Sequence, residues 1–183
     1  KAENIDPGAR HIQNSYGILN YMDLGYDYCR PGLLYMGVTS DDEVEIQSAP
    51  DFIPILSIYA NVSVVKWLKP GETVSYGRHF KAEKPTKVAT VSIGYADGLP
   101  RILSNQGLKV RVNGVLCELI GNICMDQCMV DVTDVENVQE GDVVCFIGEG
   151  LTVDRITRAA HTINNETLTS IAARMPRLEK RNK

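Results

Sequence analysis

Every second residue is hydrophobic between residues 56 and 64, at Leu56, Ile58, Ala60, Val62 and Val64. A period of two is typical of a strand with one buried face, and Pro70-Gly71 is expected to end it. Shorter apolar runs predict further strands at residues 86–93, 108–112, 115–120, 128–132 and 143–147. Asn113-Gly114 favours a two-residue hairpin between two of them, because both residues tolerate a positive φ. Several short strands joined by turns are typical of a barrel or a sandwich.

The first 50 residues follow a different pattern. Apolar residues between positions 12 and 24 recur near a period of 3.6, which predicts one short helix that Gly25 ends. These residues are Ile12, Tyr16, Leu19 and Met22. The apolar run at 26–37 is broken by Arg30-Pro31-Gly32, which predicts a strand, a turn and a further helical or extended segment. This order is typical of an α/β unit.

An acidic, proline-containing connector separates the two patterns. Residues 38–51 include an acidic run at 41–45 and Pro50, and Pro54 follows shortly afterwards. The sequence therefore predicts a domain boundary near residue 50, with one domain over residues 1–50 and a β-rich domain over residues 51–183.

A further helical pattern lies near the end of the chain. Thr152 is its candidate N-cap, and Asn164-Asn165 are expected at its exit. The apolar face consists of Ile156, Ala159, Ala160 and Ile163. The basic tail after Arg177 is expected to be solvated or frayed.

Composition narrows the class of protein. The 183 residues are 44% hydrophobic and 23% charged, which is ordinary for a globular chain. Lys and Arg total 19 against 23 Asp and Glu, and this net charge of −4 argues against a nucleic-acid partner. The apolar stretches are much shorter than the roughly 20 residues that a membrane span needs. Residue 1 is not Met and opens no signal peptide, so we interpret it as a cut within a longer chain.

The cysteine pattern indicates reduced thiols and a cytoplasmic protein. The chain has five cysteines, an odd number in a chain long enough to fold without disulfides. They lie mostly in apolar runs, at Cys29, Cys117, Cys124, Cys128 and Cys145. The three histidines are too scattered to complete a zinc site with any of them, so we expect buried thiols and no metal.

A candidate anion site lies in the first domain. Arg30, Gly32 and Leu33 follow the expected strand, and Ser15 precedes Arg30 by 15 residues. A guanidinium, two backbone N–H groups and a hydroxyl could together bind one small anion. The alternative is a surface arginine before an ordinary Pro-Gly turn, with Ser15 as a helix cap.

Two tyrosines beside glycines are candidates for a functional cleft. Tyr76 precedes Gly77, and Tyr95 follows Gly94, both at the ends of expected strands. Tyrosines at a barrel rim also pack an apolar ring and leave the hydroxyl in water, which requires no catalysis. Similarly, Met125-Asp126 is either a binding segment or a core methionine followed by a turn aspartate.

Five motifs, taken together, occur in the order found in alanine racemases. They are His-Ile-Gln-Asn-Ser at 11–15, Arg-Pro-Gly at 30–32, Val-Ser-Tyr-Gly at 74–77, Ile-Gly-Tyr-Ala-Asp-Gly at 93–98 and Gly-Asn-Ile-Cys-Met-Asp-Gln at 121–127. Matches at 141–144, 162–164 and 174–177 extend the likeness over nearly the whole chain. The sequence therefore resembles the C-terminal half of an alanine racemase.

The resemblance implies a fold, a cofactor and an assembly. Alanine racemases are fold-type III enzymes that use pyridoxal 5'-phosphate and consist of an (α/β)8 barrel followed by a mainly β domain. Residues 1–50 would be the last barrel segments, where the phosphate site of such barrels lies. Residues 51–183 would be a β-barrel-like C-terminal domain. In this family, a head-to-tail homodimer completes each barrel mouth with the partner's β domain.

The resemblance also implies roles for the first domain. Arg30 would hydrogen-bond the pyridine nitrogen of the cofactor and leave it unprotonated, because a guanidinium does not readily give up a proton. This weakens the ring as an electron sink and limits side reactions such as transamination. Ser15, Gly32 and Leu33 would hold the phosphate through one hydroxyl and backbone N–H groups.

In the β domain, Tyr76 matches the catalytic tyrosine that takes or returns the substrate Cα proton on one face, while a Schiff-base lysine serves the other. Met125 would donate its backbone N–H to the substrate carboxylate, and Tyr95 and Asp126 would line the entrance. All four would serve the partner subunit's cofactor. The family's lysine lies near the start of the barrel and has no counterpart here, so this chain alone is expected to be inactive.

Asn165 departs from the family pattern, which has a tyrosine that crowds the substrate methyl group and contacts the cofactor phosphate. Asparagine is smaller and offers a donor and an acceptor, so the pocket is expected to admit serine. The change resembles the membrane-anchored serine racemases of vancomycin-resistance clusters, which make D-serine for altered peptidoglycan precursors. Their membrane anchor would lie outside this chain. The alternative is that Asn165 is a helix C-cap.

We therefore expect part of a pyridoxal phosphate-dependent racemase that interconverts L- and D-serine and also acts on alanine. An alanine racemase with a variant pocket is the alternative within this class, and the relative turnover of the two amino acids separates them. A non-catalytic β-barrel that dimerises or binds a ligand is the alternative of another class.

Overall fold

A computed structural model describes residues 6, 8–21, 23–40, 45–48 and 50–179. The chain divides into two compact units, Lys1–Leu56 and Ser57–Lys183, which we call the first unit and the barrel unit. The N-terminal residues 1–4, Met22 and the acidic run at 41–44, which the sequence analysis used, lie outside the described residues.

The first unit contains a small parallel β-α-β arrangement. Strand β1 (Gln13–Asn14) leads into helix α1 (Ser15–Asn20), and β2 (Cys29–Arg30) pairs parallel to β1 with Gln13 opposite Cys29. A 3-10 helix, η1 (Leu33–Met36), follows the Pro-Gly turn. The expected order of strand, turn and further helical segment is confirmed.

Helix α1 is shorter than the sequence pattern predicts. Residues 13 and 14 are extended because they pair with β2, so the helix begins at Ser15 instead of Ile12. The side chain of Asn14 caps it by accepting a hydrogen bond of 2.9 Å from the Gly17 N–H. Tyr21 leaves the helical conformation with φ −139° and ψ 63°, well before Gly25. The prediction of one helix over residues 12–24 was therefore wrong at both ends.

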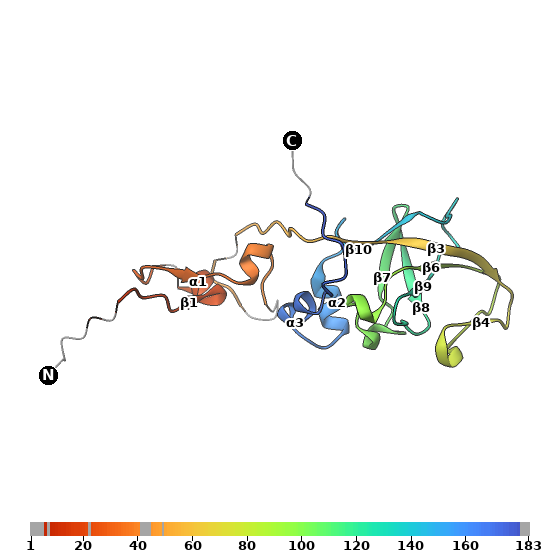
Figure 1. Ribbon diagram of the computed structural model, residues 1–183, viewed down its shortest axis with the longest axis horizontal. Helices are drawn as coiled ribbons and strands as arrows, with labels where there is room; N and C mark the ends of the chain where they lie inside the picture. Colours follow the sequence, from red (N-terminus) through yellow and green to blue (C-terminus); the bar gives the residue numbers. More distant parts are fainter. Residues whose placement is uncertain (1–5, 7, 22, 41–44, 49, 180–183) are drawn as a thin grey trace. The chain divides into compact units, whose positions relative to one another are not determined.

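Six strands of the barrel unit form a closed barrel in the order β10-β3-β6-β9-β8-β7 (Figure 1). Their bounds are Ile58–Leu68 for β3, Thr86–Val91 for β6, Lys109–Val112 for β7, Val115–Ile120 for β8, Cys128–Asp131 for β9 and Val143–Ile147 for β10. All neighbouring pairs are antiparallel. The expected mainly β fold is confirmed, and of the two expected architectures the structure has the barrel.

The hairpin between β7 and β8 forms at the expected residues. Val112 pairs with Val115, and the two residues between them are Asn113 at φ 47° and Gly114 at φ 83°. Positive φ at both positions matches the twist of the flanking strands, which is why Asn-Gly is favoured there.

Strand β3 does not keep its alternation to Val64. The register with β6 shifts between Val62, which pairs with Val91, and Val64, which pairs with Thr90. A bulge of one residue turns the following side chains to the other face. Val62 is buried, but Val64 is 50% exposed, so the expectation of an inward Val64 was wrong.

A small hairpin that the sequence pattern did not predict lies between β3 and β6. Its strands, β4 (Thr73–Val74) and β5 (Phe80–Lys81), have two residues each, which is too short for a periodic signal. Val74 and Phe80 pack in a core cluster whose other members are Leu68, Ala82, Val88, Ile120, Cys124 and Met129. The barrel core therefore holds this hairpin in place.

Two helices follow β10 where one was expected. Helix α2 (Val153–Ala159) ends before Ile163, which is the N-cap residue of α3 (Asn164–Thr169). Asn164 is buried at the start of α3, where its side chain accepts a hydrogen bond from Thr157 Oγ1 and donates one to Asp154, both at 2.7 Å. A buried amide that makes such bonds specifies one arrangement of the helices. The expectation that Asn164-Asn165 lie at a helix exit was wrong.

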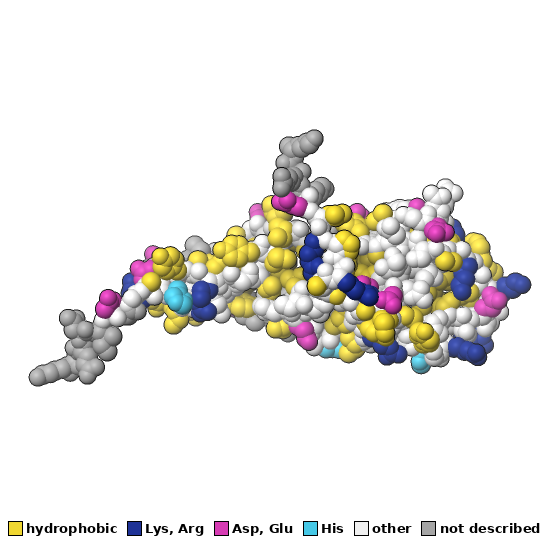
Figure 2. Space-filling view, in the orientation of Figure 1, with side chains coloured by type: hydrophobic (Ala, Val, Ile, Leu, Met, Phe, Trp, Pro, Cys, Tyr) yellow, Lys and Arg dark blue, Asp and Glu magenta, His cyan; other side chains and the backbone are white. Residues whose placement is uncertain are grey.

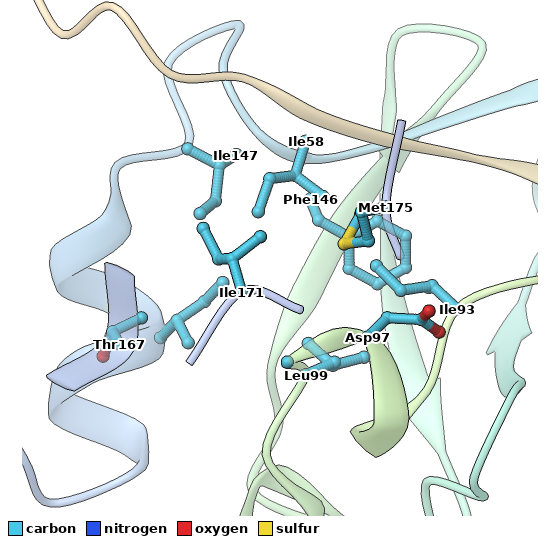
Figure 3. A pocket seen from close by; sticks show the side chains of 11 residues that line it. Ile58, Ile93, Asp97, Leu99, Phe146, Ile147, Thr167, Ile171 and Met175 are labelled. Carbon is cyan, nitrogen blue, oxygen red and sulfur yellow. The ribbon is translucent and has the colours of Figure 1, made fainter. Parts of the chain in front are cut away.

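The C-terminal helices and the segment after them pack on the barrel through an apolar seam. Figure 3 shows Ile58, Phe146 and Ile147 of the barrel and Ile171 and Met175 of the C-terminal segment lining one pocket. The cavity between them has a volume of about 20 Å³. Beyond this segment, Leu178 in the expected tail is 94% exposed.

The cysteines are unpaired, and four of the five are buried, as expected. Burial raises the pKa of Cys117 to about 11 and also raises the pKa of Cys128. No group of three or more metal-ligating side chains occurs among the described residues. Within the same part of the chain, no helix is long and apolar enough to cross a membrane.

Two loops meet at one rim of the barrel. Because Val91 pairs with Cys128, the segment after β6 lies beside residues 121–127, which precede β9 and which we call the 121–127 loop. Gly94 is the point of closest approach, since a Cβ built there would lie 2.3 Å from the Cys124 carbonyl oxygen and 2.4 Å from that of Met125. The φ of Gly94 is −149°, which any residue adopts, so glycine is needed here for space.

We predict that Gly94→Ala lowers the melting temperature of the complete protein by about 5 °C or more, because rigid backbone atoms must move apart. Gly17→Ala is the control: the backbone of Gly17 is not in the positive-φ region, and the nearest atoms to a Cβ built there lie 3.4 Å away, at ordinary contact distance. Thermal unfolding followed by circular dichroism measures both. Equal losses in the two variants would contradict the close contact at Gly94.

Candidate active site

Tyr76 lies in a turn with unusual backbone angles. It begins the 3-10 helix η2 (Tyr76–Arg78) between β4 and β5, directly after Ser75 at φ 70° and ψ 167°. This region of backbone conformation is almost restricted to glycine, and other residues occupy it at a cost of order 1–3 kcal/mol. Tyr76 is 76% exposed within this chain, so the barrel unit positions it mainly through its backbone.

The 121–127 loop holds this turn through two hydrogen bonds. The Ser75 hydroxyl donates to the Asn122 carbonyl oxygen at 2.6 Å, and the Asn122 side-chain amide donates to the Tyr76 carbonyl oxygen at 2.8 Å. Asn122 itself is 7% exposed. The two bonds run in opposite directions between the same two segments, which fixes the turn against the loop.

The same loop presents Met125 and Asp126. A hydrogen bond of 2.9 Å from the Cys124 N–H to the Gln127 carbonyl oxygen makes the loop turn tightly, and Met125 at the turn is 53% exposed. Within the part of the chain that the structure describes, no group accepts a hydrogen bond from the Met125 N–H. This amide is therefore suited to receive a carboxylate.

Tyr95 is attached to the other side of the loop. It begins η3 (Tyr95–Asp97), and its N–H donates to the Cys124 carbonyl oxygen at 3.0 Å. The Ala96 N–H donates to the Met125 carbonyl oxygen at 2.9 Å. Tyr95 is 43% exposed. The structure thus brings the turns of Tyr76 and Tyr95 onto one loop, together with Met125 and Asp126.

Arg174 adds a contact that the sequence analysis did not assign. Its Nε donates to Asp97 at 2.7 Å and its Nη2 donates to Asp126 at 2.6 Å. These bonds, above all the one to Asp97, raise the pKa of Arg174 and keep it charged. Arg174 is 77 residues from Asp97 and 48 from Asp126, so no local pattern could reveal the link. It joins the C-terminal segment to both rim loops.

Asn165 lies elsewhere in the barrel unit, in the first turn of α3, where it is exposed. The interpretation of Asn165 as a helix C-cap is therefore wrong, because the helix starts here instead of ending. Its neighbour Asn164 points inward and holds α3 against α2. By fixing the start of α3, Asn164 also fixes the position of Asn165.

The candidate anion-binding residues lie together in the first unit. The Gly32 N–H donates to the Ser15 hydroxyl oxygen at 2.9 Å, and Leu33 begins η1 directly afterwards. Arg30 donates from Nε to the His11 carbonyl oxygen at 2.8 Å and from Nη2 to that of Ile12 at 3.2 Å. Because Asn14 caps α1, the Ser15 hydroxyl is not used as the cap and instead meets Gly32.

The surface of the barrel unit is mixed in character. Figure 2 shows apolar side chains at the surface among acidic and basic ones. Among the exposed apolar residues are Tyr76, Tyr95, Met125 and Ile163.

Comparisons with known proteins identify the family of this chain. Residues 55–179 match the family model described as alanine racemase, C-terminal domain. Alanine racemase 1 of Clostridium acetobutylicum is 40% identical over 182 residues, covering 97% of this chain and 47% of the relative. An amino-acid racemase of Enterococcus faecalis is 39% identical over 171 residues, covering 93% of this chain and 24% of the relative.

Solved structures give the same result. Alanine racemase from Bacillus anthracis with bound L-Ala-P has a TM-score of 0.89 and 31% identity, covering 98% of this chain and 46% of that one. The enzyme from Bartonella henselae with covalently bound pyridoxal phosphate has a TM-score of 0.82 and 35% identity, covering 95% and 47%. The chain spans about half the length of these alanine racemases. It belongs to the family of alanine racemase C-terminal domains.

Proposed function

We propose that this chain is the C-terminal half of a pyridoxal phosphate-dependent racemase that interconverts L- and D-alanine. The observation that carries the proposal is the 121–127 loop, which holds the Tyr76 turn through Asn122 and presents the Met125 N–H. Relatives named alanine racemase support alanine as the substrate. They favour it over serine, which the sequence analysis preferred because of Asn165.

The residues of the first unit fit the cofactor. The Ser15 hydroxyl and the Gly32 N–H lie 2.9 Å apart, and a Cβ at Gly32 would come within 4 Å only of the Ser15 hydroxyl, so backbone can approach a phosphate. Arg30 uses two of its five N–H donors on backbone carbonyls, which orients the guanidinium and leaves donors for a ring nitrogen. Leu33 would add its backbone N–H to the phosphate. When bound, pyridoxal phosphate supplies an electron-accepting ring that acidifies the substrate Cα–H bond.

The residues of the barrel unit would handle the substrate. The Tyr76 phenol would take or return the Cα proton on one face, and a lysine outside this chain would serve the other face. The Met125 N–H would hold the substrate carboxylate, while Tyr95 and Asp126 would line the entrance. In a head-to-tail homodimer these residues of one protomer would act at the cofactor of its partner.

Serine is the second candidate substrate, because Asn165 is exposed at the start of α3 where alanine racemases have a tyrosine. Its amide can hydrogen-bond a hydroxymethyl group, and its small size leaves room beside the substrate Cβ. The relative from Enterococcus faecalis carries the broader name amino-acid racemase, which does not restrict the substrate to alanine. A role in D-serine supply for altered peptidoglycan, with an N-terminal membrane anchor on an otherwise cytoplasmic enzyme, would follow from this second candidate.

We predict that the complete enzyme with pyridoxal phosphate racemises L-alanine and that Tyr76→Phe lowers kcat about 10²–10⁴-fold, because one proton acceptor is lost. Chiral chromatography and Cα deuterium uptake in D₂O measure both. Tyr59→Phe, a half-exposed tyrosine of β3, is the control and should retain activity. Unchanged exchange in Tyr76→Phe would favour a non-catalytic barrel module.

We further predict that Asn165→Tyr lowers kcat/KM for serine about 10-fold or more relative to alanine, because the ring fills the space beside Cβ. Alanine turnover in the same variant is the internal control and should persist or rise. Parallel assays with L-serine and L-alanine measure the ratio. An unchanged ratio would remove Asn165 from substrate selection.

A further inference from the structure

We propose that Asn122 is a positioning residue, which keeps the strained Ser75–Tyr76 backbone in the conformation that aims the Tyr76 phenol. This inference rests on the proposed function and adds to it a residue that touches neither substrate nor cofactor. Three observations support it: the backbone angles of Ser75, the pair of hydrogen bonds to Asn122, and the exposure of Tyr76 within this chain.

The backbone angles show that the turn needs external support. Ser75 has φ 70° and ψ 167°, and Gly77 and Arg78 also have positive φ, at 77° and 52°. A serine at such angles relaxes to a common conformation unless its surroundings hold it. Relaxation at Ser75 would rotate the next residue, and Tyr76 is the next residue.

The hydrogen bonds show where that support comes from. The Asn122 backbone oxygen accepts a hydrogen bond from the Ser75 hydroxyl, and the Asn122 side-chain amide donates one to the Tyr76 carbonyl oxygen. One residue therefore holds the strained backbone at both Ser75 and Tyr76. The Asn105 side-chain amide donates to Asn122 Oδ1 at 3.3 Å, which orients the Asn122 amide group. A Cβ at Gly121 would lie 2.9 Å from the Ser75 Cβ, so the loop backbone also lies directly against the turn.

The position of Asn122 explains why this support matters for the reaction. Asn122 belongs to the loop that presents Met125. The same short segment therefore positions both the Tyr76 phenol and the Met125 N–H that would bind the substrate carboxylate. Tyr76 is 76% exposed within this chain, so its own barrel unit positions it mainly through the backbone that Asn122 holds. A displacement of about 1 Å in a reacting group can cost about 100-fold in rate.

The test uses the complete holoenzyme with alanine. Asn122→Ala should lower kcat about 10- to 100-fold while KM changes less than about 3-fold, because the phenol is displaced but the Met125 N–H is retained. Both directions of racemisation must slow together, since the variant cannot alter the equilibrium. The Cα-deuterium isotope effect should rise for the enantiomer whose proton Tyr76 removes and fall toward unity for the other, because the lysine step then no longer limits the rate.

A second substitution separates positioning from packing. Glycine adopts the Ser75 angles freely, so Ser75→Gly combined with Asn122→Ala should recover at least 5-fold of the lost kcat. A loss that came only from packing would not be recovered. Asn122→Asp keeps the size of the side chain but replaces the amide donor by a carboxylate oxygen that the Tyr76 carbonyl repels, so it should show the same changes in the isotope effects if Asn122→Ala folds poorly.

Thr133→Val is the matched control for lost hydrogen bonds. Thr133 follows the C-terminal end of β9, at the opposite end of this strand from the 121–127 loop. Its hydroxyl accepts a hydrogen bond from the Lys87 N–H at 3.0 Å and donates one to the Asp131 carboxylate at 2.6 Å. This variant should lose stability without any change in the isotope effects.

A wild-type enzyme that racemises neither amino acid would overturn the proposed function. If the wild type is active and Tyr76→Phe is inactive, but both Asn122 variants show unchanged isotope effects, the role of Asn122 is overturned and the proposed function stands.

Discussion

Closure of the barrel by β10 is the constraint on which the rest of the barrel unit depends. Val144 of this last strand pairs with Ala60 of β3 on one side and with Val112 of β7 on the other. A closed barrel leaves no free strand edge, and its pairings join segments far apart in the chain. Because β6, β8 and β9 meet at one rim, closure also fixes where the two rim loops begin.

At that rim the backbone is tightly held while the side chains that it carries are exposed. The 121–127 loop receives hydrogen bonds from the turns of Tyr95 and Tyr76, and Arg174 ties Asp97 to Asp126. Gly94 allows the two loops to approach within contact distance. Such a surface is pre-organised for binding, because the conformational entropy of these segments is lost on folding and not on binding.

Local pattern predicted the six barrel strands and the Asn113-Gly114 hairpin, since both signals come from residues adjacent in the chain. It failed where pairing or packing overrides local preference. Residues 13 and 14 joined a strand instead of a helix, and the bulge in β3 turned Val64 outward. The two-residue strands of the small hairpin and the boundary between α2 and α3 carried no periodic signal at all.

By itself the sequence determined the family, the approximate positions of the six barrel strands along the chain and the identities of the candidate site residues, because these depend on residue types and spacing along the chain. Only the tertiary structure decided that Ser15 meets Gly32, that Asn165 starts a helix, and that Asn122 and Arg174 join the rim segments. These features depend on packing and hydrogen bonds between segments that lie up to 77 residues apart in the chain. No preference between neighbouring residues encodes them.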